Sequence, residues 1–277
     1  MKKYYLFIAL AMVAAMSVSC KNNNKKAKEA ADATAEVVEA AKTILADDVL
    51  ATLDEIAKSF IDDAGKVEAH KIIAANLTPE ERMVKPDYLL DPKDVNSMVT
   101  KSQKLNALAI LMMERDIRKA YEMPIDKVDE TMTRLMAELN HPNSFENNFK
   151  MSIPEKVAET YRQYKERGDL ASFWQFSFAF VNEMAYLVSQ NPYPFFRNLT
   201  EKQFAIFNSR FFSCYAAVKE LAKYDEQVAE VLKIFEENRC VDTYEESVKA
   251  FGSLASAKQT IIDTKDVIAA RRSNLLK

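Results

Sequence analysis

Only two of the 277 residues in this chain are histidine. Few residues could therefore take part in histidine-dependent catalysis or bind a metal ion. Glu138 and His141 have the Glu-x-x-His spacing that places a carboxylate and an imidazole on one helix face in carboxylate-bridged di-iron bundles. Such a site needs a second Glu-x-x-His pair, but Val67 stands three positions before His70. His141 also directly precedes Pro142, where a helix is expected to end. We therefore predict no metal site and no cofactor, with His141 at a helix terminus.

Other catalytic signatures are absent from the sequence. It contains no Gly-x-Ser-x-Gly motif, phosphate-binding loop, dinucleotide fingerprint or His-Glu-x-x-His. A Ser–His–acid arrangement would require partners that converge only in space. The sequence therefore predicts a protein that is not an enzyme, and an enzyme of unknown class is kept as an alternative.

Cys214 and Cys240 are the thiols that follow Cys20 in the chain. In an oxidising compartment the two could form a lasting disulfide. The other interpretation is two separate cysteines, with Cys214 packed in the core as a small apolar residue. Both alternatives stay open at this point.

Aromatic residues concentrate between residues 173 and 215, which hold half of those in the chain. The segment 170–190 carries apolar side chains, Trp174 and Phe178 among them, on nearly every helical face, and this predicts a central buried helix. Glu183 in this segment and Arg210 in 201–222 are both flanked by apolar residues. Because a lone buried charge is costly, we expect these two to pair.

Two interpretations of these helices compete. In the first, helices 170–190 and 201–222 simply form the core. In the second, they enclose a cavity for a hydrophobic or amphiphilic ligand, with Glu183 or Arg210 at its polar head and with the turn at Tyr193 as the mouth. The candidate ligand-binding residues are then Trp174, Phe178, Glu183, Tyr193, Arg210 and Phe211. If the aromatics of the turn were exposed, they would instead form a protein-contact patch.

The bulk composition is that of a globular protein, with 48% hydrophobic and 29% charged residues. The formal charge is −3, and it becomes −5 without Lys2 and Lys3. A mildly acidic surface does not attract nucleic acid, so no nucleic-acid partner is expected. Only three residues are glycine, which argues against a strand-rich fold with many turns and bulges.

The N-terminus has the layout of a cleaved export signal. Lys2 and Lys3 form a basic start, residues 4–16 are apolar and uncharged, and the small residues of 17–19 precede Cys20. The apolar run is shorter than the roughly 20 residues of a membrane-spanning helix. We therefore expect residues 1–19 to be a signal peptide.

Ser17-Val18-Ser19-Cys20 resembles the lipobox of bacterial lipoproteins, although Ser17 departs from the usual Leu. The resemblance implies that Cys20 becomes the first mature residue and carries lipid, palmitate among the possible chains. Several fatty chains would anchor the protein stably to a membrane. The layout broadly resembles lipoproteins of the Bacteroidota, but the run after Cys20 is basic and amide-rich rather than acidic. We therefore expect an anchor in the outer membrane that faces the periplasm.

Helical signals run through the remainder of the chain. Apolar residues recur at helical spacing, and Ser152, Thr200 and Thr243 each begin a capping-box pattern. The predicted helices are 35–62, 66–76, 93–122, 125–140, 153–167, 170–190, 201–222, 225–238 and 244–272. The predicted fold is all-α, a multi-helix bundle or irregular antiparallel helical array in a single domain over 35–277, with residues 20–34 as a polar tether.

No characterised family is identified across the mature chain. The function we predict is that of a non-catalytic, membrane-anchored envelope protein that acts as an interaction module for an unknown protein partner. The alternative is a carrier of a hydrophobic small molecule, which predicts a cavity of a few hundred Å³ between helices 170–190 and 201–222.

Overall fold

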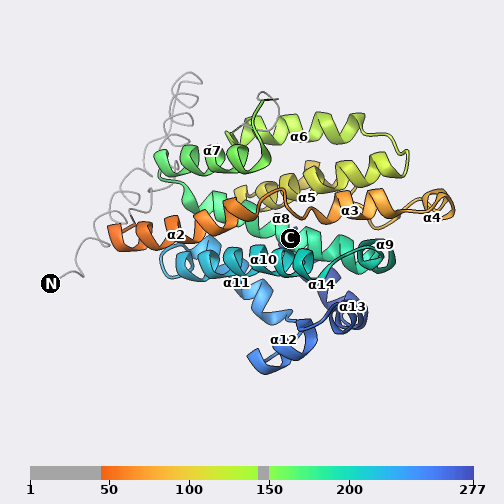
Figure 1. The fold of residues 1–277 in the computed structure, drawn as a ribbon. Helices are drawn as coiled ribbons and strands as arrows, with labels where there is room; N and C mark the ends of the chain where they lie inside the picture. Colours follow the sequence, from red (N-terminus) through yellow and green to blue (C-terminus); the bar gives the residue numbers. More distant parts are fainter. Residues whose placement is uncertain (1–44, 143–149) are drawn as a thin grey trace, which may run out of the picture. The chain divides into compact units, whose positions relative to one another are not determined.

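The computed structural model describes residues 45–142 and 150–277. Within them, thirteen α-helices and one 3-10 helix make up the regular structure, and no strand occurs (Figure 1). The all-α prediction is therefore confirmed. The described residues belong to one compact unit. The predicted signal peptide, Cys20 and the tether lie outside the described residues.

The helices follow one another through short connections. Their bounds are α2 (Asp47–Asp63), α3 (Ala69–Asn76), α4 (Pro79–Met83), the 3-10 helix η1 (Asp94–Ser97), α5 (Lys101–Ala120), α6 (Asp126–Glu138), α7 (Ile153–Glu166), α8 (Leu170–Gln190), α9 (Pro192–Phe196), α10 (Glu201–Leu221), α11 (Glu226–Glu237), α12 (Tyr244–Phe251), α13 (Leu254–Asp263) and α14 (Lys265–Leu275).

Helix α8 is the central helix of the described fold, as its apolar residues predict. It packs against α3, α5, α7, α10 and α14 (Figure 1). Most of its side chains are buried, including Trp174 and Phe178, which are inaccessible to solvent. A helix that is apolar on all faces is stable only when other elements cover it on all sides. The antiparallel array around α8 provides that cover.

Three of the predicted helices are wrong in their extent. Of the helix predicted over 35–62, residues 35–44 lie outside the described residues, and α2 begins at Asp47 because Ala46 before it has extended backbone angles. The helix predicted over 93–122 is interrupted at Thr100, whose hydroxyl accepts a hydrogen bond from Gln103 N–H and so starts α5 afresh. The helix predicted over 244–272 is three helices, because Ser253 caps a new one and α13 ends at Thr264. At Thr100 and Ser253 a side-chain cap competes successfully with helix continuation, whereas Ala46 and Thr264 make no side-chain capping hydrogen bond.

The segment after α8 is also more regular than predicted. Residues 191–196 were expected to form a turn, but Pro192–Phe196 is the short helix α9. Proline at the first helical position has its backbone angle already set for a helix and needs no donor there. Phe195 is fully buried at the end of this segment.

A buried ionic cluster ties α14 to α5 and α8. Arg272 of α14 donates through Nε to Glu183 of α8 at 2.7 Å and through Nη2 to Glu114 of α5. Glu114 also accepts from the backbone N–H of Leu90 at 2.9 Å. Both carboxylates are inaccessible to solvent, so their interactions with Arg272 offset a large desolvation cost. The predicted Glu183–Arg210 pair is therefore wrong, because the partner of Glu183 comes from the far end of the chain.

This cluster predicts an unusual pH dependence of stability. Burial, together with repulsion from Glu114, raises the pKa of Glu183 from 4.5 to about 8 against the attraction of Arg272. The folded chain then binds a proton more tightly than the unfolded chain between about pH 4.5 and 8, so the free energy of unfolding falls as the pH rises through that window.

We expect Glu183→Gln, which mimics the protonated carboxyl, to gain stability relative to the wild type as the pH rises from 5 to 8. Urea denaturation at several pH values measures the difference. The exposed Glu237→Gln variant should keep a constant difference from the wild type over the same range. A parallel pH profile for Glu183→Gln and the wild type would contradict the assignment.

Candidate functional site

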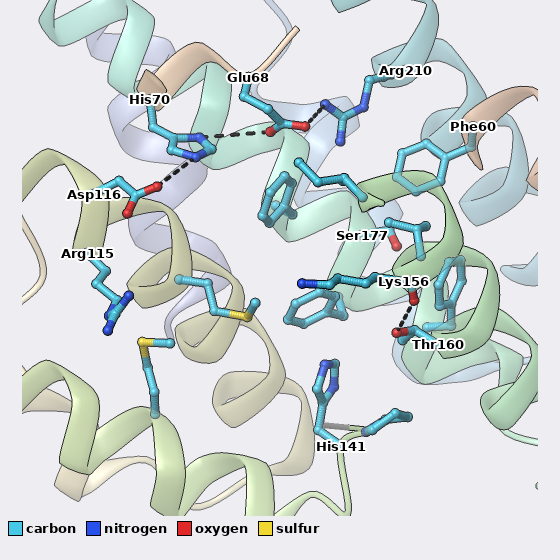
Figure 2. A pocket seen from close by; sticks show the side chains of 18 of the residues that line it. Phe60, Glu68, His70, Arg115, Asp116, His141, Lys156, Thr160, Ser177 and Arg210 are labelled. Atoms are coloured by element: carbon cyan, nitrogen blue, oxygen red, sulfur yellow. Dashed lines mark hydrogen bonds and ion pairs between the residues drawn. The ribbon is translucent and has the colours of Figure 1, made fainter. Parts of the chain in front are cut away.

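A cleft of about 530 Å³ lies on the side of α8 that faces α3, α5, α6 and α7 (Figure 2). More of its wall surface is apolar than polar, and the apolar part includes aromatic and methionine side chains. The apolar wall residues include Phe60, Met112, Met132, Met136, Val157, Phe173, Phe176 and Phe180. Such walls suit the apolar part of a small molecule.

One end of the cleft is polar and is built on the turn between α2 and α3. Gly65 in this turn has a φ of 78°, a left-handed conformation that favours glycine. Its N–H donates to Glu68 Oε1 at 3.0 Å. Arg210 of α10 donates to the same oxygen at 3.0 Å and to the carbonyl of Val67 at 3.0 Å. The turn and α10 thus fix the orientation of the Glu68 carboxylate.

His70 and Asp116 extend this polar end across to α5. His70 Nε2 lies 3.2 Å from Asp116 Oδ2, and His70 Nδ1 lies 3.9 Å from Glu68 Oε2. The hydrogen bond from His70 lowers the pKa of Asp116, so that side chain is an ionised acceptor at neutral pH. Figure 2 shows Asp116, His70, Glu68 and Arg210 in a row along this end.

Several polar atoms at this end have no hydrogen-bond partner among the described residues. They are Glu68 Oε2, His70 Nδ1 and Arg210 Nε. Their side chains are only 7%, 7% and 3% exposed, respectively. Buried polar atoms in proteins are nearly always hydrogen-bonded, and an exception in a cleft marks a place where a bound group would be stabilised.

His141 lies on the opposite side of the cleft, after the end of α6 (Figure 2). Its Nδ1 is 2.7 Å from the hydroxyl of Tyr164, and its buried Nε2 has no hydrogen-bond partner in the part of the chain that the structure describes. Burial lowers the pKa of His141 to about 4, with a contribution from Arg167, so the ring is neutral at pH 7. His141 is therefore a neutral polar group on this side of the cleft.

Of the residues predicted to bind a ligand, only Arg210 borders this cleft. Between α8 and α10, where the sequence predicted a cavity, aromatic side chains pack against one another. Phe178 packs against Phe211 with ring centroids 6.1 Å apart, and Phe235 of α11 packs against both rings. Trp174 packs against Phe60 and Phe173 and is fully buried.

The remaining predicted site residues lie outside the cleft. Tyr193 is 63% exposed, with the Lys258 ammonium 4.1 Å from its ring centroid. Since Phe195 beside it is buried, this segment does not form the continuous aromatic patch that was considered. Cys214 and Cys240 are both free thiols, so the disulfide considered from the sequence is not formed. Burial raises the pKa of the Cys214 thiol well above its usual value.

Sequence reasoning missed Glu68, His70 and Asp116. Gly65 followed by Glu68 and His70 at a helix start was a weak signal, because a glycine turn can position polar groups beside a helix. Asp116 lies 46 positions after His70 on a long helix, where many acids face solvent. No spacing rule connects them, so only the packing of α3 against α5 brings them together.

The described residues contain no group of three or more His, Cys, Asp or Glu side chains placed to hold a metal ion. In the same residues, no helix combines the length and the apolar character that crossing a membrane requires. His70 Nδ1 also has no hydroxyl or thiol hydrogen-bonded to it there, so no nucleophile–histidine–acid triad is assembled at this end of the cleft.

Comparisons with protein-family models, with curated proteins and with solved structures find no match for this chain.

We expect Arg210→Met to lower the free energy of unfolding by about 3–5 kcal/mol, because it leaves the Glu68 carboxylate buried without its ionic partner. The double variant Glu68→Gln/Arg210→Met should recover most of this loss. As a control, Arg162→Met removes exposed ion pairs with Glu159 and Glu166 and should cost at most about 1 kcal/mol. Denaturant titration measures all three, and equal losses for Arg210→Met and Arg162→Met would contradict the account.

Proposed function

We propose that this protein binds a small molecule with an apolar body and a polar head group in the cleft beside α8, and that it does so without catalysis. The observation that carries the proposal is the cleft of about 530 Å³, with aromatic and methionine walls and buried polar atoms that lack hydrogen-bond partners among the described residues. Small-molecule sites typically have volumes of about 300–1,000 Å³, apolar walls and a few polar groups.

The polar groups of the cleft favour binding over catalysis. Glu68 and Arg210 are held to each other and to backbone groups, so they are positioned rather than exposed for reaction. His141 is neutral at pH 7 and has no carboxylate hydrogen-bonded to either ring nitrogen among the described residues. These features suit the recognition of a ligand better than proton transfer, which needs a pKa near the working pH.

A second candidate function is contact with a protein partner. Met83 and Val84 at the end of α4 are 80% and 74% exposed. Arg82 beside them donates to the carbonyls of Ala74 and Ala120 at 2.9 and 3.0 Å, which holds this short helix in place. Two exposed apolar side chains on a fixed turn favour such a contact, although they are a smaller feature than the cleft.

We further propose that the protein is a lipoprotein, anchored through Cys20 to the outer membrane and facing the periplasm. The support for this is the sequence 1–20, which resembles an export signal followed by a lipobox. An anchored binding protein would hold its ligand close to the membrane, where amphiphilic molecules concentrate.

Filling the cleft tests the proposed binding. Val157 lines the cleft and is half-buried, so Val157→Trp would place an indole in the ligand volume. The probe is N-phenyl-1-naphthylamine, which we expect to fluoresce when it binds to the Cys20→Ser chain. We expect Val157→Trp in this chain to weaken the binding of the probe at least about tenfold. Val248→Trp, at a side chain 54% exposed, is the matched control and should leave the binding unchanged.

Circular dichroism and thermal unfolding must show that both tryptophan variants fold. A fluorophore that does not bind, or that binds equally to Val157→Trp and the wild type, would argue against the cleft as a ligand site. Contact with a protein partner would then become the leading candidate.

Lipid attachment is tested separately. In bacteria fed radioactive palmitate, we expect the wild-type chain to incorporate label and to sediment with outer-membrane fractions. The Cys20→Ser chain should incorporate none and be released into the soluble fraction, while Cys240→Ser should behave as the wild type. Label retained by Cys20→Ser would rule out Cys20 as the lipidated residue.

A further inference from the structure

We propose that the ligand of the cleft carries a hydrogen-bond donor, a hydroxyl or an amine, as its head group, and that Glu68 and His70 bind this group. The inference rests on the ligand-binding function proposed above and specifies the chemistry and the orientation of the ligand. An anionic head group, such as a carboxylate, would be repelled at this position by the carboxylates of Glu68 and Asp116.

The two oxygens of Glu68 play different roles. Oε1 accepts from Gly65 N–H and from Arg210 Nη1, both at 3.0 Å. Oε2 accepts from no group in the described residues, although the side chain is 7% exposed. A carboxylate oxygen can only accept, and a buried one is stabilised strongly by a donor. Glu68 therefore presents one acceptor to the cleft in a fixed direction.

His70 presents its second nitrogen to the same place. Its Nε2 lies 3.2 Å from the ionised carboxylate of Asp116, so Nε2 carries a proton and donates it. Nδ1 is 3.9 Å from Glu68 Oε2, which is too long for a hydrogen bond between them. Both residues line the cleft, and both of these atoms lack a hydrogen-bond partner among the described residues, so one polar group bound between them would satisfy both.

The bridging group must donate to Glu68 whichever protonation state His70 has. If the ring is neutral, Nδ1 is an acceptor and an amine can donate to both atoms. If the ring is protonated, a hydroxyl can accept from Nδ1 and donate to Glu68 Oε2. A carboxylate has no proton to donate, and its charge would face Glu68 and Asp116 at close range.

The apolar body of such a ligand would extend from this end along the wall formed by Phe180, Phe176 and Met132. The opposite orientation has support of its own, since Lys71 also borders the cleft, as do Arg115 and Lys156 (Figure 2). A ligand held by these cations would carry an anionic head group. The two orientations therefore predict opposite head-group preferences.

Isothermal titration calorimetry with three probes of equal chain length distinguishes them. We expect 1-octylamine and 1-octanol to bind the Cys20→Ser chain at pH 7 at least about tenfold more tightly than octanoate. In Glu68→Gln, the amide oxygen can still accept from Gly65 and Arg210, while an NH₂ group replaces the free acceptor. This variant should lose about tenfold in affinity for 1-octylamine, and Glu80→Gln on the exposed surface should lose none.

The outcomes separate this inference from the proposed function. Octanoate binding as tightly as 1-octylamine, or more tightly, would overturn the head-group inference and leave ligand binding intact. The same holds if Glu68→Gln folds but binds 1-octylamine unchanged. No binding of any of the three probes would overturn both proposals. If Glu68→Gln does not fold, the comparison of the three probes on the Cys20→Ser chain still decides the question.

Discussion

The buried ion pair between Glu68 and Arg210 is the interaction on which the site depends. It joins the turn after α2 to α10, and both side chains are almost inaccessible to solvent. Because each charge would be costly alone, the pair fixes the position of both elements. Arg210 also donates a hydrogen bond to one carboxylate oxygen of Glu68, while the other oxygen has no partner among the described residues. One interaction therefore serves both the fold and the candidate site.

Helix α8 separates two kinds of packing. On the side of α10 and α11, Phe178, Phe211 and Phe235 pack ring against ring. On the side of α5, α6 and α7, Phe173, Phe176 and Phe180 form one wall of the cleft. Glu183 on the same helix pairs with Arg272, which ties α14 to α8. The helix is thus at once the core of the fold and the floor of the candidate site.

The fold was largely predictable from the sequence because helical signals are local. Capping residues such as Thr200 and apolar spacing act within a few positions, and α8 was correctly identified as central by its composition. The breaks at Thr100 and Ser253 were missed because a cap inside an apolar pattern competes with continuation, and packing decides the outcome.

The candidate site could not be predicted in the same way, because its contacts are long-range. Arg210 was recognised as a buried charge, but the sequence pointed to Glu183 as its partner and the structure pairs it with Glu68, 142 positions away. Aromatic density indicated the region of a cavity but not the side of α8 on which space remains. A cavity remains where the shapes of side chains from different helices do not fill the space between them. A sequence pattern does not encode how these shapes meet in three dimensions.

Crystals of the Cys20→Ser chain soaked with 8-bromooctan-1-ol test the central claim most directly, because anomalous scattering locates the bromine atom. The account predicts a bromine peak inside the cleft, near Met132 or His141 and away from Glu68, with the hydroxyl within hydrogen-bond distance of Glu68 Oε2. A bromine peak only on the outer surface, or an unoccupied cleft at saturating ligand, would contradict the claim that this cleft is a ligand-binding site.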